Sequence, residues 1–207
     1  MLDAYVQQIN LKYPAAVISS ADQLLANTEA ERTEWTRAMA NLVFPLYTLR
    51  DDHDMPDPTD QFSDRWAFTA GGVRFIGFHA GGDMSVGATD LAFIEAELIA
   101  LGGLAPVLVC HKPMADEFLN PIAAGLGRQE LLTLLGAYHV PLYLSGHWHH
   151  DMIGQVIDGV ETLDVTGPLA VGGHFQVLDI YSSRIDIHAY TTANPFADQD
   201  PMITAPI

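Results

Sequence analysis

The sequence has little cysteine, little positive charge and no long hydrophobic run, and each shortage excludes something. The single cysteine, Cys110, leaves no intrachain disulfide, and its place in the apolar run 107–110 predicts a buried core residue. Nine lysine and arginine residues stand against 26 aspartate and glutamate residues, and the net charge of −17 argues against binding to nucleic-acid backbones or anionic membranes. No apolar stretch reaches the roughly 18 residues that a membrane span needs. Because the first residues also lack the basic start of a signal peptide, we expect a cytoplasmic protein.

The remaining pattern predicts one α/β domain that covers residues 1–207. Nearly half of the residues, 49%, are hydrophobic, which suits a compact core. Helix-type periodicity alternates with short apolar runs up to residue 150, and short strands with glycine turns follow. Thr28 and Glu31 have the spacing of a helix capping box. The predicted strands lie at 15–18, 44–49, 66–69, 73–76, 106–110, 140–144, 160–163, 175–180 and 184–188.

The stretch Ser145-Gly-His-Trp-His-His150 follows the buried strand at 140–144. Glycine permits a sharp turn there, so His147 and His149 can approach one point from a loop. Imidazole is the commonest metal ligand in proteins, which makes this stretch a candidate metal site. A surface histidine cluster in an acidic protein explains the six residues equally well when they are considered alone.

Three other strands also end in residues of the metal-ligand type. They are followed by Asp22, by Asp52-His53-Asp54 and by His111. Each has an ordinary alternative, such as a helix cap or a solvated loop, but the carboxyl ends of strands are where α/β sites form. Carboxylate and imidazole without thiolate suit Mn²⁺, Fe or Zn²⁺, bound as one ion or as a pair about 3.5–4 Å apart.

In this order the motifs resemble those of the calcineurin-like metallophosphoesterases. The resemblance covers nearly the whole chain, and Gly146-His147-Trp148-His149 at a strand end is its most specific part. It implies a four-layer α/β/β/α sandwich with a dinuclear metal centre. Three positions depart from the family pattern: Ala21 replaces a glycine, Asp51-Asp52-His53 replaces Gly-Asn-His, and no Asp-x-His strand precedes the helix at 2–13. We therefore expect the N-terminal strand of the sandwich to be missing, unless Asp186-Ile-His188 replaces its motif instead of forming an edge hairpin.

The resemblance also implies a role for each residue at the strand ends. The metal ligands would be Asp22 on both ions, Asp52, His111 and His147 on the second ion, and His149 on the first. His53 would protonate the leaving oxygen or stabilise charge on the phosphoryl group, and Asp54 would orient its imidazole. Among the remaining histidines, His79, His150 and His174 lie on predicted loops near the site.

The function implied is metal-dependent hydrolysis of a phosphoester by a metal-bound hydroxide. The loops at 55–64, 79–88 and 114–126 should line the mouth of the site, and they offer little positive charge beyond Lys112 and Arg128. A small phosphodiester or monoester is therefore the expected substrate, and a nucleic-acid duplex is not. Two alternatives stay open: a degenerate relative that acts as a metal-binding or interaction module, and a metal-dependent hydrolase of other esters. Assembly into a homo-oligomer is also open.

Overall fold

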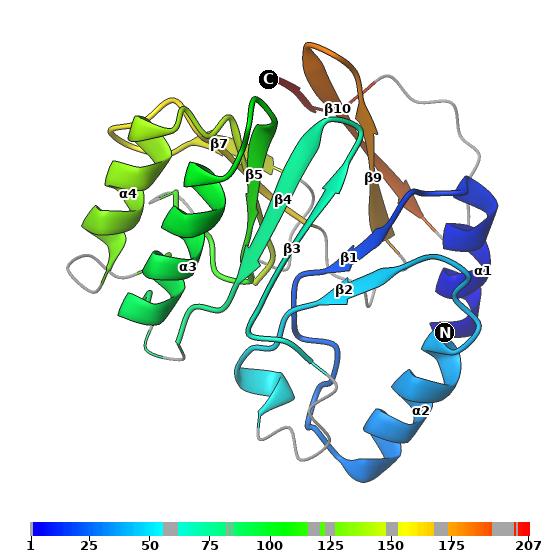
Figure 1. Ribbon diagram of the computed structural model, residues 1–207. Helices are drawn as coiled ribbons and strands as arrows, with labels where there is room; N and C mark the ends of the chain where they lie inside the picture. The colour runs from blue at the N-terminus through cyan, green and yellow to red at the C-terminus, as the bar shows by residue number, and fades with distance from the viewer. Residues whose placement is uncertain are drawn as a thin grey trace.

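The computed structural model describes residues 2–55, 62–81, 83, 85–115, 121–122, 127–147, 153–167, 174–191, 201 and 203–207. Its elements follow the chain from blue to red in Figure 1. In order they are α1 (Leu2–Lys12), β1 (Val17–Ser19), α2 (Glu29–Met39), β2 (Leu46–Thr48), the short 3₁₀ helix η1 (Asp52–Asp54), β3 (Arg65–Ala70), β4 (Val73–Phe78), α3 (Ala88–Ile99), β5 (Ala105–Val109), α4 (Arg128–Ala137), β6 (Leu142–Ser145), β7 (Ile153–Val156), β8 (Leu163–Thr166), β9 (His174–Ile180), β10 (Arg184–Thr191) and β11 (Ile203–Pro206).

The strands form a large mixed sheet and two smaller groups beside it. The large sheet has the order β3-β4-β5-β6-β8-β7, with β4, β5, β6 and β8 parallel and an antiparallel strand at each edge. Strands β1 and β2 form a parallel pair, and β11-β10-β9 form an antiparallel group. Helices α3 and α4 cover one face of the large sheet, while the smaller groups and then α1 and α2 lie on the other side (Figure 1). The predicted four-layer α/β/β/α architecture is confirmed.

Two hydrophobic cores lie on the two faces of the large sheet. Successive residues of its strands alternate between them, because side chains of a strand point to opposite faces. In β5, Leu108 packs into the core under α3 and α4, whereas Val107 and Val109 pack into the core shared with β9–β11. Cys110 is buried in the core under the helices, as its apolar run predicted. Both faces of the sheet are therefore covered by hydrophobic cores, so a functional site is expected at the ends of its strands.

Local signals located several elements correctly. Thr28 and Glu31 form the predicted capping box at the start of α2. The glycine turn at 71–72 joins β3 to β4, and both glycines have positive φ, +59° and +85°. Gly77 is needed in β4 for a different reason: a Cβ there would lie 2.4 Å from the indole ring of Trp66. The predicted hairpin therefore has both the turn and the close packing that its glycines suggested.

Two predictions about the C-terminal strands need correction. The strand expected at 160–163 lies at Leu163–Thr166 instead, because residues 158–159 form a turn and Leu163 is the first to pair with β6. The strand β11 was not expected at all. It is four residues long and includes Pro206, and it exists because Ile203–Pro206 pairs with the outer edge of β10, a contact that no local pattern encodes.

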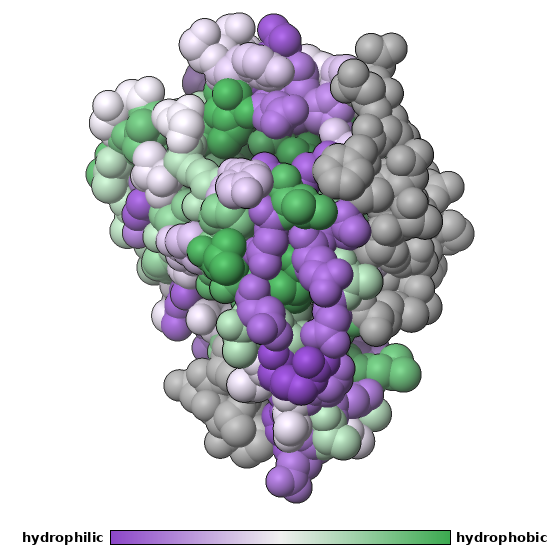
Figure 2. Space-filling model, turned by 90° about the vertical axis from the view of Figure 1, so that its right-hand side faces the viewer, coloured by the Kyte–Doolittle hydropathy of each residue, from purple (hydrophilic) through white to green (hydrophobic). Residues whose placement is uncertain are grey.

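The outer face of α1 and α2 is mainly hydrophilic. Figure 2 shows hydrophilic side chains in a band down this face, with separate hydrophobic ones beside it. Most residues of α2 are polar or charged, which suits a helix that has one side in water. Among the described residues, no helix is both long and apolar enough to cross a membrane. The cytoplasmic location stays a prediction.

Candidate metal centre

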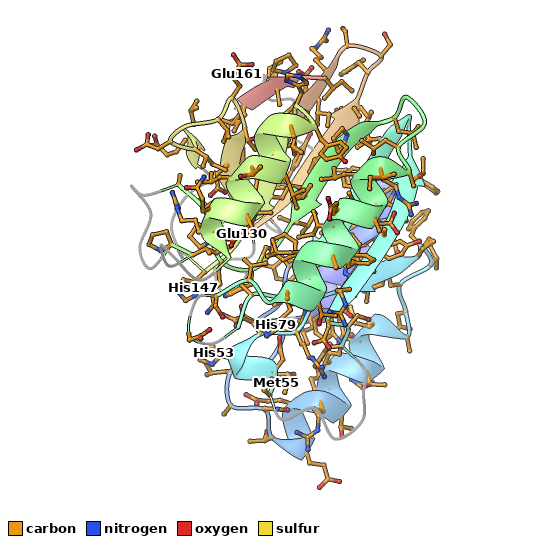
Figure 3. The ribbon with its side chains drawn as sticks, turned by 60° about the vertical axis from the view of Figure 1, so that its left-hand side comes forward. His53, Met55, His79, Glu130, His147 and Glu161 are labelled. Atoms are coloured by element: carbon orange, nitrogen blue, oxygen red, sulfur yellow. The ribbon has the colours of Figure 1, made fainter. Side chains whose placement is uncertain are left out.

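The candidate residues lie where strands of both sheets end. Asp22 follows β1, residues Asp51–Asp54 follow β2, His111 follows β5, and His147 follows β6. Strands β1 and β2 are parallel to each other, and so are β5 and β6, so the ends of each pair meet at one edge. In Figure 3 the labelled His53, His79 and His147 lie below the middle of the view, while Glu161 lies at the top. The site predicted from the strand ends therefore has a common location.

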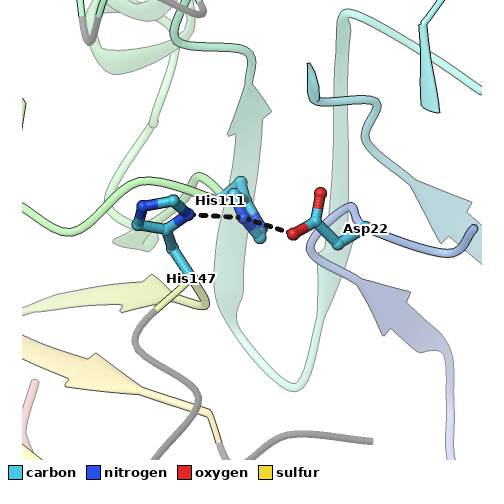
Figure 4. A group of neighbouring side chains, drawn as sticks. All are labelled: Asp22, His111 and His147. Atoms are coloured by element: carbon cyan, nitrogen blue, oxygen red, sulfur yellow. Dashed lines mark hydrogen bonds and ion pairs between the residues drawn. The ribbon is translucent and has the colours of Figure 1, made fainter. Parts of the chain in front are cut away.

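Three of the predicted ligands form a compact group. A ligand atom from each of Asp22, His111 and His147 lies within 4.8 Å of the others. Nε2 of His111 is 3.0 Å from Oδ2 of Asp22 and 3.2 Å from Nδ1 of His147 (Figure 4). His111 is buried and stands between the other two. The arrangement offers one oxygen and two nitrogens to a single point.

The orientation of the His111 ring is set by the loop after β1. Its Nδ1 lies 2.9 Å from the backbone carbonyl oxygen of Ser20. Because a carbonyl only accepts, Nδ1 carries the proton, and Nε2 is directed to Asp22. Gly146 permits this arrangement, since a Cβ at that position would lie 3.2 Å from both Nδ1 of His111 and Oγ of Ser20.

Charge inside the group favours the ionised forms of Asp22 and His111. Burial alone would lower the pKa of His111, but the hydrogen bond to Asp22 and the charges of Asp22 and Asp51 outweigh it, so this pKa is raised. Burial likewise works to raise the pKa of Asp22, but the hydrogen bond and charge of His111, with the charges of His53 and Lys112, hold it below its usual value. Asp22 and His111 therefore each stabilise the charged form of the other.

The backbone that carries the ligands adopts unusual conformations. Ala21, Asp22 and His147 have φ values of +84°, +53° and +64°, in the left-handed region that residues other than glycine rarely adopt. Such strain persists only where surrounding contacts impose it, and it gathers at functional sites. Ala21, which has no glycine-like freedom at φ +84°, therefore adopts this conformation at an energetic cost.

Two charged side chains at the centre were not recognised as part of it. Asp51 is fully buried, and its Oδ1 lies 3.4 Å from Nζ of Lys112. That ammonium also lies 3.5 Å from Nδ1 of His147. The sequence placed Lys112 beside the mouth of the site, and this is wrong, because the residue is 1% exposed. Their positions beside Asp52 and His111 were the signal that could have found them.

A further buried carboxylate holds together the two loops that carry the histidines. Asp164 of β8 accepts hydrogen bonds from the hydroxyl of Ser145, at 2.7 Å, and from the backbone N–H groups of Met114 and Ala115, at 2.6 and 3.0 Å. Ser145 precedes Gly146-His147, and Met114 follows His111-Lys-Pro113. Burial raises the pKa of Asp164 to about 6, against these hydrogen bonds. Sequence reasoning missed this residue, because it lies inside a strand far from both motifs.

The two predicted catalytic residues have other partners than expected. The imidazole of His53 is exposed, and its Nδ1 lies 2.9 Å from the carbonyl oxygen of Leu25, not against Asp54. Asp54 is buried and accepts hydrogen bonds from the backbone N–H groups of Asp22 and Leu24, at 2.9 and 3.2 Å. Burial and the charge of Asp22 raise the pKa of Asp54 to about 6, although backbone N–H groups oppose the shift. Asp54 thus supports the loop that carries Asp22.

The remaining predicted residues divide into two groups. His149, with Trp148 and His150, lies outside the described residues, and of Asp52 only the backbone, in η1, is described. His79 follows β4 and its Nδ1 lies 2.8 Å from the carbonyl oxygen of Arg50, next to Asp51. Asp186 and His188 lie on β10, where Asp186 pairs with Arg184 and Thr204. Asp186 and His188 are therefore not part of the group formed by Asp22, His111 and His147.

The protein is similar to known proteins in its structure, not in its sequence. No protein-family model matches the sequence, and no curated protein matches it. A dimetal phosphatase from Danio rerio superposes with a TM-score of 0.74 at 13% identity, covering 93% of this chain and 86% of the other. Purple acid phosphatase PPD1 of yellow lupin superposes at 0.71 and 15% identity over 98% of this chain, which spans 48% of that protein. The chain has the calcineurin-like metallophosphoesterase fold. GAP50, titled the anchor in the inner membrane complex of Plasmodium, superposes at 0.65 and 13% identity, covering 100% and 82%.

The described residues of this metallophosphoesterase fold suit a divalent ion. Oδ1 of Asp22 is buried and, among the described residues, has no hydrogen-bond partner. A buried carboxylate oxygen without a partner is costly in free energy, and a divalent ion bound by this carboxylate would satisfy it. One carboxylate and two imidazoles are a ligand set for Mn²⁺, Fe or Zn²⁺.

Proposed function

We propose that the protein is a metal-dependent phosphoesterase. The observation that carries the proposal is the group Asp22, His111 and His147, in which one carboxylate and two imidazoles bring a ligand atom each to within 4.8 Å of the others. It lies at the strand ends of a metallophosphoesterase fold. A divalent ion bound there would polarise the phosphoryl oxygen and lower the pKa of bound water. We propose Mn²⁺, Fe or Zn²⁺ as that ion.

The chain's own residues would then bind, orient and transfer a proton. Asp22 and the two histidines would hold the ion, and the carbonyl of Ser20 would keep Nε2 of His111 aimed at it. His53 is exposed, and its Nδ1 is engaged by the carbonyl of Leu25, so its Nε2 can serve a leaving oxygen. We propose His53 as the acid that protonates this oxygen.

We propose a small phosphodiester or monoester as the substrate. A net charge of −17 repels polyanions over the range of the protein's field, and the repulsion grows with the charge of the substrate. Lys112, next to the ligands, is too deeply buried to bind a bulky anion from solution. A substrate with one phosphoryl group therefore fits better than a nucleic-acid duplex.

The test combines metal content with turnover. The wild-type chain, reconstituted with Mn²⁺, should hydrolyse p-nitrophenyl phosphate or its bis-ester, and His147→Ala should lose both the ion and at least a hundredfold in turnover. His53→Ala should keep the ion and lose most of the turnover. His139→Asn is the matched control, because His139 is exposed, lies at the end of α4 and has a φ of +48° that asparagine tolerates. Equal turnover in His147→Ala and the wild type would overturn the proposal.

A second candidate is an interaction module on the same fold. The structural similarity to the GAP50 anchor favours considering it. The same experiment separates the two: a chain that binds Mn²⁺ tightly yet hydrolyses neither phosphoesters nor carboxylic esters would be a binding module. Hydrolysis of carboxylic esters alone would instead indicate a hydrolase of another class.

A further inference from the structure

Lys112 is an unusual residue in an unusual place. The sequence contains only two lysines, and the other, Lys12, lies over the ring of Tyr190 with Nζ 3.6 Å from its centroid. Lys112 is 1% exposed, although the net charge of −17 would stabilise a cation almost anywhere on the surface. Burying an ammonium is costly unless it is paired. We therefore expect a partner of opposite charge next to the ammonium of Lys112.

The contacts of the ammonium supply that reason. Nζ lies 3.4 Å from Oδ1 of Asp51, which is fully buried, and 3.5 Å from Nδ1 of His147. The second distance is long for a hydrogen bond, so the ammonium stands beside the imidazole edge while its charge is matched by Asp51. The same Nδ1 lies 3.2 Å from Nε2 of His111, inside the metal-ligand group. A fixed positive charge thus lies immediately next to the proposed ion.

The charge of Lys112 could bind the phosphoryl group of a substrate or act on the metal centre, and the burial of Lys112 favours the second role. A lysine that binds the phosphoryl group of a substrate must be reachable from solution, and Lys112 is not. Its charge therefore acts on the centre itself. An ammonium in this position neutralises Asp51 and repels any second divalent ion that approaches within a few ångströms of His147.

We propose that the ammonium of Lys112 takes the place of a second divalent cation, so that the centre holds one ion paired with a lysine. The inference rests on the metal site of the proposed function, but it concerns the number of ions and not the reaction. Two-ion centres place their ions about 3.5–4 Å apart, and the anionic ligands between them balance the charge. Here Lys112 provides that balance for Asp51 from within the chain.

The experiment counts ions without measuring turnover. The full chain is reconstituted with Mn²⁺, its metal content is measured by elemental analysis, and electron paramagnetic resonance separates an isolated Mn²⁺ from a coupled pair. We expect one ion per chain with an uncoupled signal in the wild type. In Lys112→Met, which keeps the length but loses the charge, we expect two ions per chain, the second bound at least tenfold more tightly than in the wild type.

Three controls make the result specific. Lys12→Met removes the other lysine and should leave one ion per chain. Lys112→Gln repeats the loss of charge with a polar side chain, in case the methionine variant does not fold. The double variant Lys112→Met/Asp51→Asn should return to one ion, because the carboxylate that would attract the second ion is gone.

The outcomes separate this inference from the proposed function. Two coupled ions in the wild type, or one ion in both Lys112 variants, would overturn the role of Lys112 and leave the phosphoesterase proposal standing. No bound Mn²⁺ in the wild type would overturn the metal site and this inference with it. One ion in the wild type and two in the Lys112 variants would establish the lysine as the second cation.

Discussion

The carboxylate of Asp54 holds the backbone of Asp22 in place across 32 positions of sequence. Its Oδ2 accepts a hydrogen bond from the N–H of Asp22 at 2.9 Å and its Oδ1 accepts one from Leu24 at 3.2 Å. The N–H of Asp51 also points to Oδ2, at 3.3 Å. One buried side chain thus joins the loops after β1 and β2. These hydrogen bonds explain how Asp22 is held at its positive φ of +53°.

Replacing Asp54 should therefore weaken metal binding, although Asp54 is not itself a ligand, because it holds the backbone of Asp22. Asp54→Ala leaves three backbone N–H groups without their acceptor, and we expect the free energy of unfolding to fall by about 2–3 kcal/mol. Mn²⁺ affinity should fall about tenfold or more, because Asp22 is no longer held. Urea denaturation and calorimetric titration measure both. Asp83→Ala, which removes an exposed loop carboxylate, is the control, and an equal effect there would contradict the positioning role.

Ala21 should tolerate glycine unusually well. Its φ of +84° is strained for alanine and free for glycine, so the relief offsets the entropy that glycine loses on folding. We expect Ala21→Gly to leave the free energy of unfolding within about 0.5 kcal/mol of the wild type or to raise it. Ala38→Gly, inside helix α2, should lower it by about 1 kcal/mol or more. Equal losses in the two variants, measured by urea denaturation, would show that the backbone at Ala21 is unstrained.

Gly146 should not tolerate alanine. The added Cβ would lie 3.2 Å from both Nδ1 of His111 and Oγ of Ser20, so the imidazole would have to move by a few tenths of an ångström. We expect Gly146→Ala to cost about 1–2 kcal/mol of stability and about a tenfold loss in Mn²⁺ affinity. Gly136→Ala is the matched control: it lies in α4, its Cβ would meet only Val160 at 3.5 Å, and it should not weaken metal binding.

The raised pKa of Asp164 predicts that the difference in stability between the wild type and Asp164→Asn depends on pH. Its pKa of about 6 in the folded chain exceeds the ordinary 3.8, so between pH 4 and 6 the folded state keeps a proton that the unfolded state releases. Its contribution to stability therefore falls as pH rises through this window, by roughly 3 kcal/mol, and is constant above it.

Asparagine at this position does not titrate. The stability deficit of Asp164→Asn relative to the wild type should be largest near pH 4 and should shrink by that amount near pH 7. Urea denaturation at both pH values measures it, with the exposed Asp158→Asn as the comparison. A deficit that grows between pH 4 and 7 would show that the buried carboxylate ionises easily.

Metal affinity should depend on the protonation of His111. Only the neutral imidazole can bind an ion, and the pKa of His111 is raised above 6.5 by Asp22 and Asp51. Mn²⁺ affinity should therefore still increase with pH above 6.5, up to about tenfold per pH unit, and level off only above the raised pKa. Titration calorimetry in buffers of different ionisation enthalpy would detect the released proton. A constant affinity from pH 6.5 upward would contradict the raised pKa.

The helices, the hairpin and the candidate ligands could be located from the sequence because their signals are local. The capping box at Thr28 lies within four residues, and the alternation in β5 within five. The ligands Asp22, His111 and His147 each come within four residues of the end of a short apolar run, and parallel strands bring such ends together. Residue type and spacing were therefore enough to locate these elements and to predict that the three ligands lie close together.

Other features depend on contacts between distant segments, and only the tertiary structure decided them. Asp51, next to the expected ligand Asp52, is buried beside Lys112 because the loop after β2 packs against the loop after β5. Asp164 joins two histidine loops from a strand about 50 positions away from one of them. The sequence by itself determined which residues could bind a metal. The packing of β1, β2, β5 and β6 decided which of them meet, and it placed a buried ammonium beside them, because burial and charge balance are properties of the assembled strands.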